Sequence, residues 1–145
     1  MIGKNNENIT WNYVNKLSNR EEIGELESML NKSLPVDYTE CILENNGGYP
    51  SLHVFETETG MNRVFGGLLS LIEDDDDNIH DAYSTVSDRL DREDVLPFAV
   101  DPAGNYICFD FSANPASVVF WEHETNNLDK VSDTFNALIN MLREK

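Results

Sequence analysis

Residues 96–111 read LPFAVDPAGNYICFDF, and this stretch decides the fold of the chain. Its two ends, 96–100 and 106–111, are short apolar runs rich in aromatic and β-branched side chains, which predicts two strands. Between them stands Asp101-Pro102-Ala103-Gly104-Asn105, a run of turn-forming residues: proline presets one backbone angle, glycine accepts a positive φ, and Asp and Asn bond to the nearby backbone. The stretch therefore predicts an antiparallel hairpin.

Further strands are predicted on both sides of this hairpin. Residues 118–121 are apolar and follow a polar loop at 112–117, so they are expected to add a third strand. Earlier in the chain, 51–56 and 62–65 are also prone to β structure, and the polar segment between them is typical of a hairpin connection.

Two helices are predicted ahead of these strands. Ser18 stands three residues before Glu21, a spacing at which each side chain can bond the other residue's free backbone N–H, so a helix is expected to begin here. Its buried stripe is expected to be Ile23, Leu26, Met29 and Leu30. A second helix is expected after Leu34-Pro35, because proline suits a first helical turn, and Asn46-Gly47-Gly48 is expected to end it. Its inward residues are Tyr38, Cys41 and Ile42.

Two more helices follow from the same spacing rule. One is expected from Asn78 to about Asp91, with a buried face made of Ile79, Ala82, Tyr83, Val86 and Leu90. The last is expected to be capped by Ser132 or Asp133, with Phe135, Leu138, Ile139 and Leu142 inward. The whole pattern predicts a single α+β domain over residues 1–145, an antiparallel β-sheet flanked by about four helices.

The charge of the chain is its most unusual compositional property. Ten Lys and Arg against 27 Asp and Glu give a formal net charge of −17 at pH 7. Such a surface repels nucleic acid and anionic membranes, and it attracts cationic partners. The composition therefore favours a protein partner of positive charge, with no nucleic acid and no membrane.

The chain is expected to act in the cytoplasm. No stretch reaches the roughly 18 apolar residues that cross a bilayer, and the polar residues 1–10 do not have the apolar core of a signal peptide. Cys41 and Cys108 are too few for a disulfide scaffold and fit small core residues in a reducing compartment, while a Cys41–Cys108 disulfide stays open as an alternative.

Five consecutive carboxylates, Glu73, Asp74, Asp75, Asp76 and Asp77, precede the third helix. A calcium loop starting at Asp74 would need glycine at its sixth position, which is Ile79, and a closing Glu that is missing. The histidines His53, His80 and His123 do not have zinc-ligand spacing. No metal and no cofactor are therefore expected.

No catalytic residue is predicted either, because the chain has no nucleophile elbow, catalytic cysteine signature or phosphate-binding glycine loop. One enzymatic alternative stays open: a small hydrolase or metal-dependent enzyme that uses His123 with Glu122, Glu124 or Asp101.

Several segments match one family in order and spacing. They are Leu34-Pro35 with Asp37-Tyr38 leading to Asn46-Gly47-Gly48-Tyr49-Pro50; Leu96-Pro97-Phe98-Ala99 with Asp101, Gly104 and Asn105; Val119-Phe120-Trp121-Glu122-His123-Glu124; and the helix start at 131–135. Together they resemble the SUKH superfamily, also known as the Smi/Knr-like proteins, which includes many bacterial immunity proteins. Two departures are visible: Glu122 stands where the family more often has Asp, and 73–77 lies where the family varies.

The resemblance implies an α+β fold, no catalytic residues, and a role as the antidote to a polymorphic secreted or contact-delivered toxin, often a nuclease. It implies mainly structural roles for Leu34, Pro35, Tyr38, Gly47, Gly48, Pro97, Asp101, Gly104, Asn105, Trp121, His123 and Phe135. Because the family also contains regulatory interaction proteins that act without a toxin, a scaffold role is the alternative.

Charge and resemblance agree on how such a protein would act. A nuclease must be cationic to hold phosphates, so a protein of charge −17 offers the same groups another counter-charge and inhibits by occlusion. The expected contacts are Glu73, Asp74, Asp75, Asp76 and Asp77, with Asp101, Asn105, Glu122 and Glu124 as further candidates, although each also fits an ordinary turn or surface role. The oligomeric state is expected to be a monomer or a weak homodimer.

Overall fold

The computed structural model describes residues 9–144. Along the chain they form β1 (Trp11–Asn12), α1 (Arg20–Leu30), α2 (Val36–Asn45), β2 (Tyr49–Pro50), β3 (Val54–Glu56), β4 (Asn62–Val64), β5 (Gly67–Leu68), α3 (Ile79–Leu90), β6 (Val95–Val100), β7 (Tyr106–Asp110), β8 (Ser117–Glu122), β9 (Asn127–Ser132) and α4 (Phe135–Met141). The α+β class with four helices and antiparallel sheets is confirmed.

The predicted hairpin at 96–111 lies at the centre of the main sheet, whose strands follow the order β5-β6-β7-β8-β9 and pair antiparallel throughout. Leu96 pairs with Phe109 and Ala99 with Ile107, so the register shifts by one residue between Pro97 and Ala99. The shift lets β6 carry Pro97, which has no N–H to donate to a regular ladder. Two short ladders, β1-β2 and β3-β4, complete the strand pairing.

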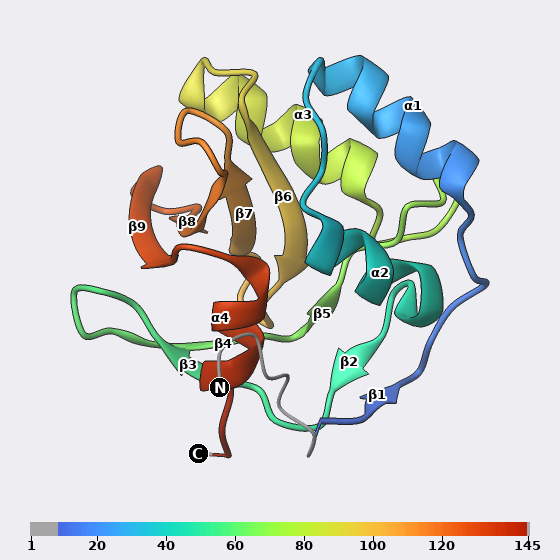
Figure 1. Ribbon diagram of the computed structural model, residues 1–145. Coiled ribbons are helices and arrows are strands. Elements are labelled where there is room, and N and C mark those ends of the chain that lie inside the picture. The colour runs from blue at the N-terminus through green and yellow to red at the C-terminus, as the bar shows by residue number, and fades with distance from the viewer. Residues whose placement is uncertain (1–8, 145) are drawn as a thin grey trace.

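Both edges of the main sheet are met by other parts of the chain. At the β5 edge, the backbone N–H of Leu68 donates to Gly48 O (2.9 Å). At the β9 edge, the connection between β3 and β4 folds over: Glu58 N donates to Lys130 O (2.8 Å), and Thr59 Oγ1 donates to Asp129 Oδ2 (2.6 Å). Figure 1 shows this connection extending to the left beneath β9.

Residues of the main sheet alternate between two hydrophobic clusters, one on each face. In β8, Phe120 belongs to the larger cluster, with Tyr38 of α2 and Phe135 of α4, whereas Trp121 belongs to the smaller one, with Val86 of α3. The period of two in a strand produces this division. Helices α2 and α4 therefore pack on one face, whereas α3 covers the other face through Val86 and also contributes Ile79 and Ala82 to the larger cluster.

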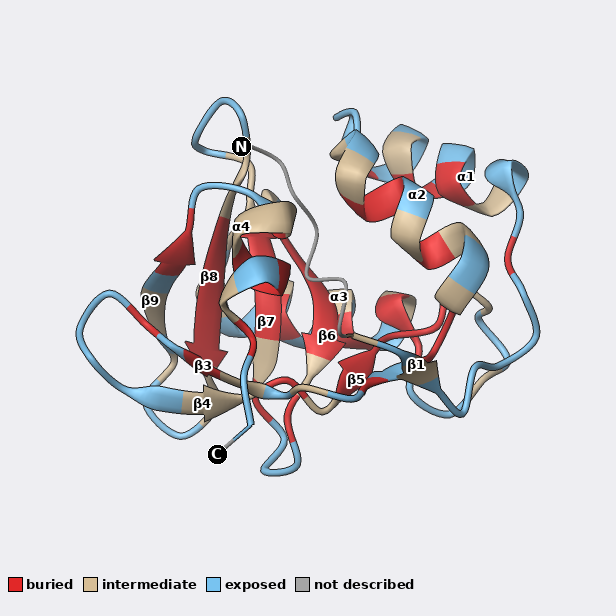
Figure 2. Ribbon diagram, turned by 60° about the horizontal axis from the view of Figure 1, so that its bottom comes forward, coloured by how far each residue is buried: buried red, intermediate tan, exposed pale blue. Residues whose placement is uncertain are grey.

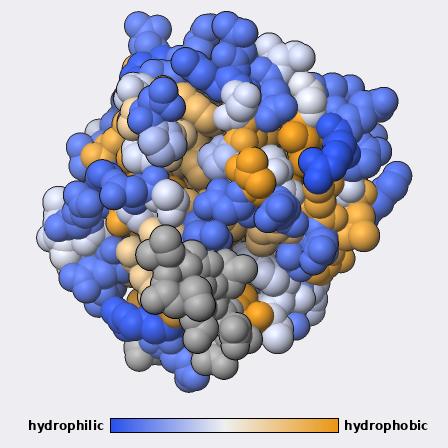
Figure 3. Space-filling view, viewed as in Figure 1, coloured by the Kyte–Doolittle hydropathy of each residue, from blue (hydrophilic) through white to orange (hydrophobic). Residues whose placement is uncertain are grey.

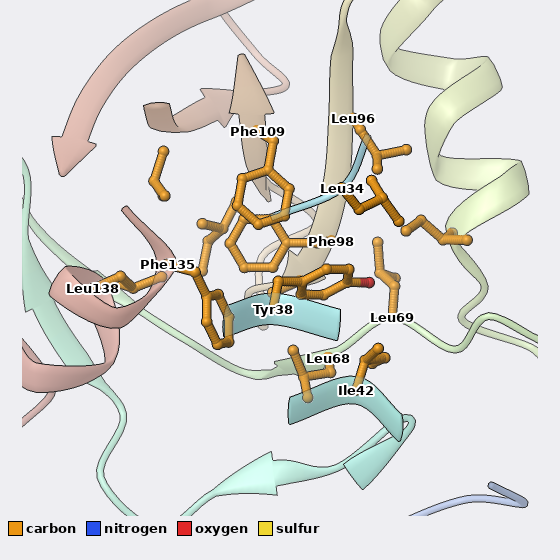
Figure 4. Close-up of a cluster of buried hydrophobic side chains, with 14 of the residues drawn as sticks. Leu34, Tyr38, Ile42, Leu68, Leu69, Leu96, Phe98, Phe109, Phe135 and Leu138 are labelled. Carbon is orange, nitrogen blue, oxygen red and sulfur yellow. The ribbon is translucent and has the colours of Figure 1, made fainter. Parts of the chain in front are cut away.

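An aromatic group at the centre of the larger cluster joins α2, α4 and the sheet. The ring centroid of Tyr38 lies 5.6 Å from Phe98, 5.2 Å from Phe109 and 5.6 Å from Phe135, and Figure 4 shows the four rings packed together. Leu34 and Ile42 are buried four residues before and after Tyr38. Tyr38 and its neighbours Leu34 and Ile42 therefore belong to the core that joins α2 to the sheet.

Two predicted helix caps are wrong by one or two residues. The reciprocal cap of α1 joins Asn19 and Glu22, with Glu22 N donating to Asn19 Oδ1 (3.1 Å), and does not involve Ser18 and Glu21. Thr134, and neither Ser132 nor Asp133, caps α4, since Ala137 N donates to Thr134 Oγ1 (3.0 Å) and Ser132 still belongs to β9.

Other corrections concern single residues and one strand. Met29 is 46% exposed and does not join the buried stripe of α1. Pro35 is the N-cap residue of α2 and precedes the first helical turn, in which it was predicted to lie. Both thiols are free, so the alternative of a Cys41–Cys108 disulfide is wrong. A fourth strand, β9, follows the three that were predicted after the third helix.

Candidate functional site

The acidic loop, residues 73–77, connects β5 to α3 and carries four exposed carboxylates. Glu73, Asp74, Asp76 and Asp77 are exposed, and Asp75 is half-buried. Burial and then the nearby Asp77 carboxylate raise the pKa of Tyr106 in β7, so the field of the loop extends to the main sheet. Four of the five acidic residues that were predicted to contact a partner are therefore exposed on one loop.

Asp75 anchors the acidic loop to the body of the protein. Its Oδ2 accepts a hydrogen bond from Ser70 Oγ (2.6 Å), and Ser70 Oγ in turn accepts from Asn46 Nδ2 (2.9 Å) and Ile72 N (3.0 Å). Two backbone bonds close the base of the loop, from Ser70 N to Asp77 O (2.9 Å) and from Ile79 N to Ser70 O (2.8 Å). One carboxylate oxygen of the half-buried Asp75 thus holds the loop, while the other four carboxylates stay at the surface.

Asn46 also ties the acidic loop to the segment between β1 and α1. Its Nδ2 donates to Lys16 O (2.9 Å), its backbone O accepts from Asn15 N (2.8 Å), and its Oδ1 accepts from Leu71 N (2.8 Å). Asn46 is fully buried, and its side-chain bonds to Ser70 Oγ and Leu71 N are buried as well, whereas its bond to Lys16 O is partly buried. The side chain of Asn46 therefore bonds to both segment 13–17 and the base of the acidic loop. Figure 1 shows the two segments close together on the right.

Glycine is required next to Asn46 because the segment packs directly on the backbone. Gly47 has φ of +76°, and a Cβ there would lie 2.5 Å from Asn15 Nδ2. At Gly48, a Cβ would lie 2.9 Å from Asn45 O and 3.3 Å from a methyl group of Val14. The Asn46-Gly47-Gly48 motif ends α2 as predicted. It also leaves room for Val14 and Asn15 to pack on the backbone, which the sequence did not indicate.

Exposed aromatic side chains stand beside the acidic loop. Tyr13 is 82% exposed and Tyr49 is 46% exposed, and their rings meet edge to face with centroids 5.9 Å apart. A pocket of about 370 Å³ lies between Tyr49 and the loop and is lined by Asp75, Asp76 and Asp77. Sequence reasoning did not propose either tyrosine as a contact, although Tyr49 belongs to the family motif.

Asp101 and Asn105 are buried and bonded within the β6–β7 turn. Asp101 Oδ1 accepts from Ala103 N (2.9 Å) and Asn105 N (2.8 Å), and Asp101 Oδ2 accepts from Asn105 Nδ2 (3.0 Å). Asn105 Oδ1 accepts from His123 N (2.9 Å), and Gly104 takes φ of +87° between them. The two side chains hold the turn against the end of β8, and both are buried, so little of either is presented to a partner.

The cluster Glu122-His123-Glu124 lies at the end of β8, where His123 N donates to Asn105 Oδ1 of the β6–β7 turn. Glu122 pairs with Arg63, whose Nη2 lies 3.4 Å from Glu122 Oε2, and only Glu124 of the three is exposed. His123 O accepts a hydrogen bond from Arg89 Nη2 (2.8 Å). Trp121, fully buried, stacks on Tyr106 and donates from Nε1 to Asn126 Oδ1 (2.8 Å).

The enzymatic alternative gains little from this geometry. Both carboxylate oxygens of Asp101 accept bonds inside its own turn, and Glu122 is engaged by Arg63 and Thr125. Within residues 9–144, no three His, Cys, Asp or Glu residues come together in an arrangement that could hold a metal ion.

A larger groove of about 640 Å³ lies between α2 and α4 and is lined by Asp37, Glu40, Cys41 and Glu44. Burial raises the pKa of Cys41 to about 11, which keeps this thiol protonated.

None of the helices in the described part of the chain combines the length and the apolar character that a membrane crossing requires.

Comparison with known proteins gives two results. Residues 18–141 match the SMI1 / KNR4 family (SUKH-1). The chain is also 27% identical over 131 residues to the SPbeta prophage-derived uncharacterized protein YokK of Bacillus subtilis (strain 168), an alignment that covers 79% of this chain and 67% of that protein.

Proposed function

This chain belongs to the SMI1 / KNR4 family (SUKH-1), and on that basis we propose that it is an immunity protein that binds and neutralises a cognate polymorphic toxin. It acts in the cytoplasm as a single domain over residues 1–145, without a cofactor and without catalysis. The toxin is a basic protein, a nuclease in the simplest case, because a nuclease needs cations at the surface that binds phosphates.

The observation that carries the proposal is the rigid display of the acidic loop. Four carboxylates project from a loop whose base is closed by two backbone bonds and whose fifth carboxylate is tied to Ser70. A contact that is already ordered loses less conformational entropy on binding than a mobile one. Together with the net charge of −17, the loop supports inhibition by occupying the basic surface with which the toxin would bind its substrate.

Co-expression with the toxin encoded by the neighbouring gene tests the proposal. Cells that express the toxin are expected to survive when the wild-type chain is present. Protection is expected to weaken for the variant E73Q/D74N/D76N/D77N, which neutralises the exposed carboxylates and leaves the anchoring Asp75 unchanged. Surviving cells should contain a complex of the two proteins that can be purified.

A matched variant separates the loop from net charge alone. E56Q/E58Q/D88N/E93Q removes the same number of exposed carboxylates from the β3–β4 hairpin, the last turn of α3 and the α3–β6 connection, and it should protect nearly as well as the wild type. Failure of the wild-type chain to protect, together with its isolation in complex with cellular signalling or wall-synthesis proteins, would instead support the regulatory scaffold.

A further inference from the structure

The segment between β1 and α1 exposes apolar side chains next to the acidic loop. We define the apolar strip as Tyr13, Val14, Leu17 and Tyr49, which are 82%, 37%, 57% and 46% exposed. Figure 2 shows the ribbon of the segment mainly in the colour of exposed residues, and Figure 3 shows that the surface of the molecule is mainly hydrophilic, with hydrophobic residues at several places on this face. Grouped exposed apolar residues of this kind mark protein contacts more often than single ones do.

The strip is held in one conformation before any partner arrives. Asn46 fixes the segment through Asn15 N and Lys16 O, at 2.8 and 2.9 Å. The ring of Tyr49 rests on Gly67, where a Cβ would lie 3.3 Å from the ring, and the edge-to-face contact orients Tyr13 against Tyr49. Rigid tyrosines supply contact area at a small cost in conformational entropy.

The backbone of Tyr13 adds an independent observation. Its φ is +59°, in the left-handed region that side chains with a Cβ disfavour and that bulky residues rarely occupy. The residue is among the most exposed large side chains of the described chain, so the fold gains little packing in return. Backbone strain without internal compensation is characteristic of residues that serve a contact.

The charge around the strip identifies the chemistry of the partner. Asn15 Nδ2 lies 3.5 Å from Asp75 Oδ2, so strip and acidic loop are adjacent, and Lys16 is one cation against the carboxylates that line the shared pocket. Stable interfaces have an apolar, aromatic centre and a polar rim. The complementary surface is therefore apolar at its centre and basic around it, while a second copy of this chain would bring two strongly negative molecules together.

We infer that the apolar strip is the energetic centre of the contact with the basic toxin, and that the acidic loop is its rim. This inference rests on the proposed function. The four strip residues slow the dissociation of the complex, and the carboxylates of the loop speed its association.

Binding kinetics on the toxin encoded by the neighbouring gene, in a catalytically inactivated form, test the inference. Y13A/L17A is expected to weaken binding by roughly 10- to 100-fold, mainly through faster dissociation. V36A/M61A is the matched control, because Val36 and Met61 are exposed apolar residues elsewhere on the molecule, and it should change affinity by less than about twofold.

A second variant separates contact from folding. Asn tolerates the left-handed conformation, so Y13N should leave the melting temperature unchanged or higher while it weakens binding. A residue with a merely structural role would lose stability and affinity together.

The outcomes are distinguishable. If the wild-type chain neither protects cells nor binds the toxin, the proposed function fails and the inference falls with it. If the wild type binds tightly and both strip variants bind within about twofold of it, the inference alone is overturned. Sedimentation that shows a homodimer disrupted by Y13A/L17A would overturn it as well, because the strip would then be covered by a second copy.

Discussion

The ring of Tyr38 lies at the centre of the aromatic group, and its buried hydroxyl does not have a hydrogen-bond partner within the described structure. Figure 4 shows it directed away from the phenylalanine rings, toward the side where Leu69 lies. An unpaired buried hydroxyl costs about 1–3 kcal/mol, so Tyr38→Phe is expected to raise the free energy of unfolding by up to about 1 kcal/mol, measured by urea denaturation. Tyr38→Leu should lower it by about 2 kcal/mol or more because a cavity forms. A clear loss of stability in Tyr38→Phe would show that the hydroxyl is bonded.

The two thiols predict how stability changes at alkaline pH. Burial raises the pKa of Cys41 from 9.0 to about 11, and burial followed by Asp110 raises that of Cys108. Between about pH 9 and 11 the unfolded chain therefore binds fewer protons than the folded one, so the free energy of unfolding falls as pH rises, by up to about 1.4 kcal/mol per thiol and pH unit.

Denaturation at pH 7, 9 and 10 measures this decline. The double variant C41A/C108A should show a smaller fall in the free energy of unfolding over the same interval. Tyrosines whose pKa is raised by burial, such as Tyr38, add to the fall mainly above their ordinary pKa of 10.0. An unchanged slope in the double variant would contradict the assignment to the thiols.

At the scale of the elements, Asn46 joins the end of α2 to two separate segments. Asn46→Ala removes the side-chain bonds to Lys16 O, Ser70 Oγ and Leu71 N and leaves buried groups unpaired, which is expected to cost about 2–4 kcal/mol. Backbone amide exchange should become faster in both 13–17 and 70–77. The control variant Asn127→Ala, at an exposed position, should have a free energy of unfolding within about 0.5 kcal/mol of that of the wild type. Faster exchange in only one segment would show that the two are held independently.

The elements that sequence reasoning located are those with a strong period. The hairpin at 96–111 and helices α1 to α3 have regular apolar spacing, and each was found to within a few residues. Strand β9 was missed because only Val131 and Ser132 of its six residues are buried, so the strand is polar as edge strands often are. The two-residue strands β1, β2 and β5 are too short to show a period.

The two wrong caps and the candidate site fail for different reasons. Ser18/Glu21 and Asn19/Glu22 have the same spacing one residue apart, and spacing alone cannot choose between them. The charge of the acidic loop was visible in the sequence, whereas its anchor, the bond from Ser70 to Asp75, does not follow a pattern of residue types. Its proximity to the segment 13–17 depends on a contact between residues 60 positions apart, Asn15 and Asp75.

At the scale of the whole molecule, net charge predicts how salt affects the free protein. Carboxylates outnumber cationic side chains 27 to 10, and like charges repel one another in the folded state. Raising NaCl from about 10 mM to about 500 mM shortens the screening length from roughly 30 Å to under 8 Å, so the melting temperature is expected to rise. Circular dichroism measures it, and E73Q/D74N/D76N/D77N should show a smaller rise. A melting temperature that falls with salt would refute the repulsion.

The same charge predicts how salt affects association. If the negative surface steers the toxin, the association rate should fall by roughly tenfold or more between low and physiological ionic strength, while the dissociation rate changes little. The variant with four neutralised loop carboxylates should associate more slowly at low salt and depend less on ionic strength, and E56Q/E58Q/D88N/E93Q should lie closer to the wild type. An association rate indifferent to salt would leave the apolar strip as the sole source of affinity.

The covered edges of the sheet have a consequence for self-association. An open sheet edge presents unpaired backbone groups to which another chain can add a strand, and repeated addition builds fibrils. Here Gly48 occupies one edge, and Glu58 and Thr59 occupy the other. Strand addition between copies is therefore hindered at both edges, and concentrated solutions of the chain are expected to resist fibril formation.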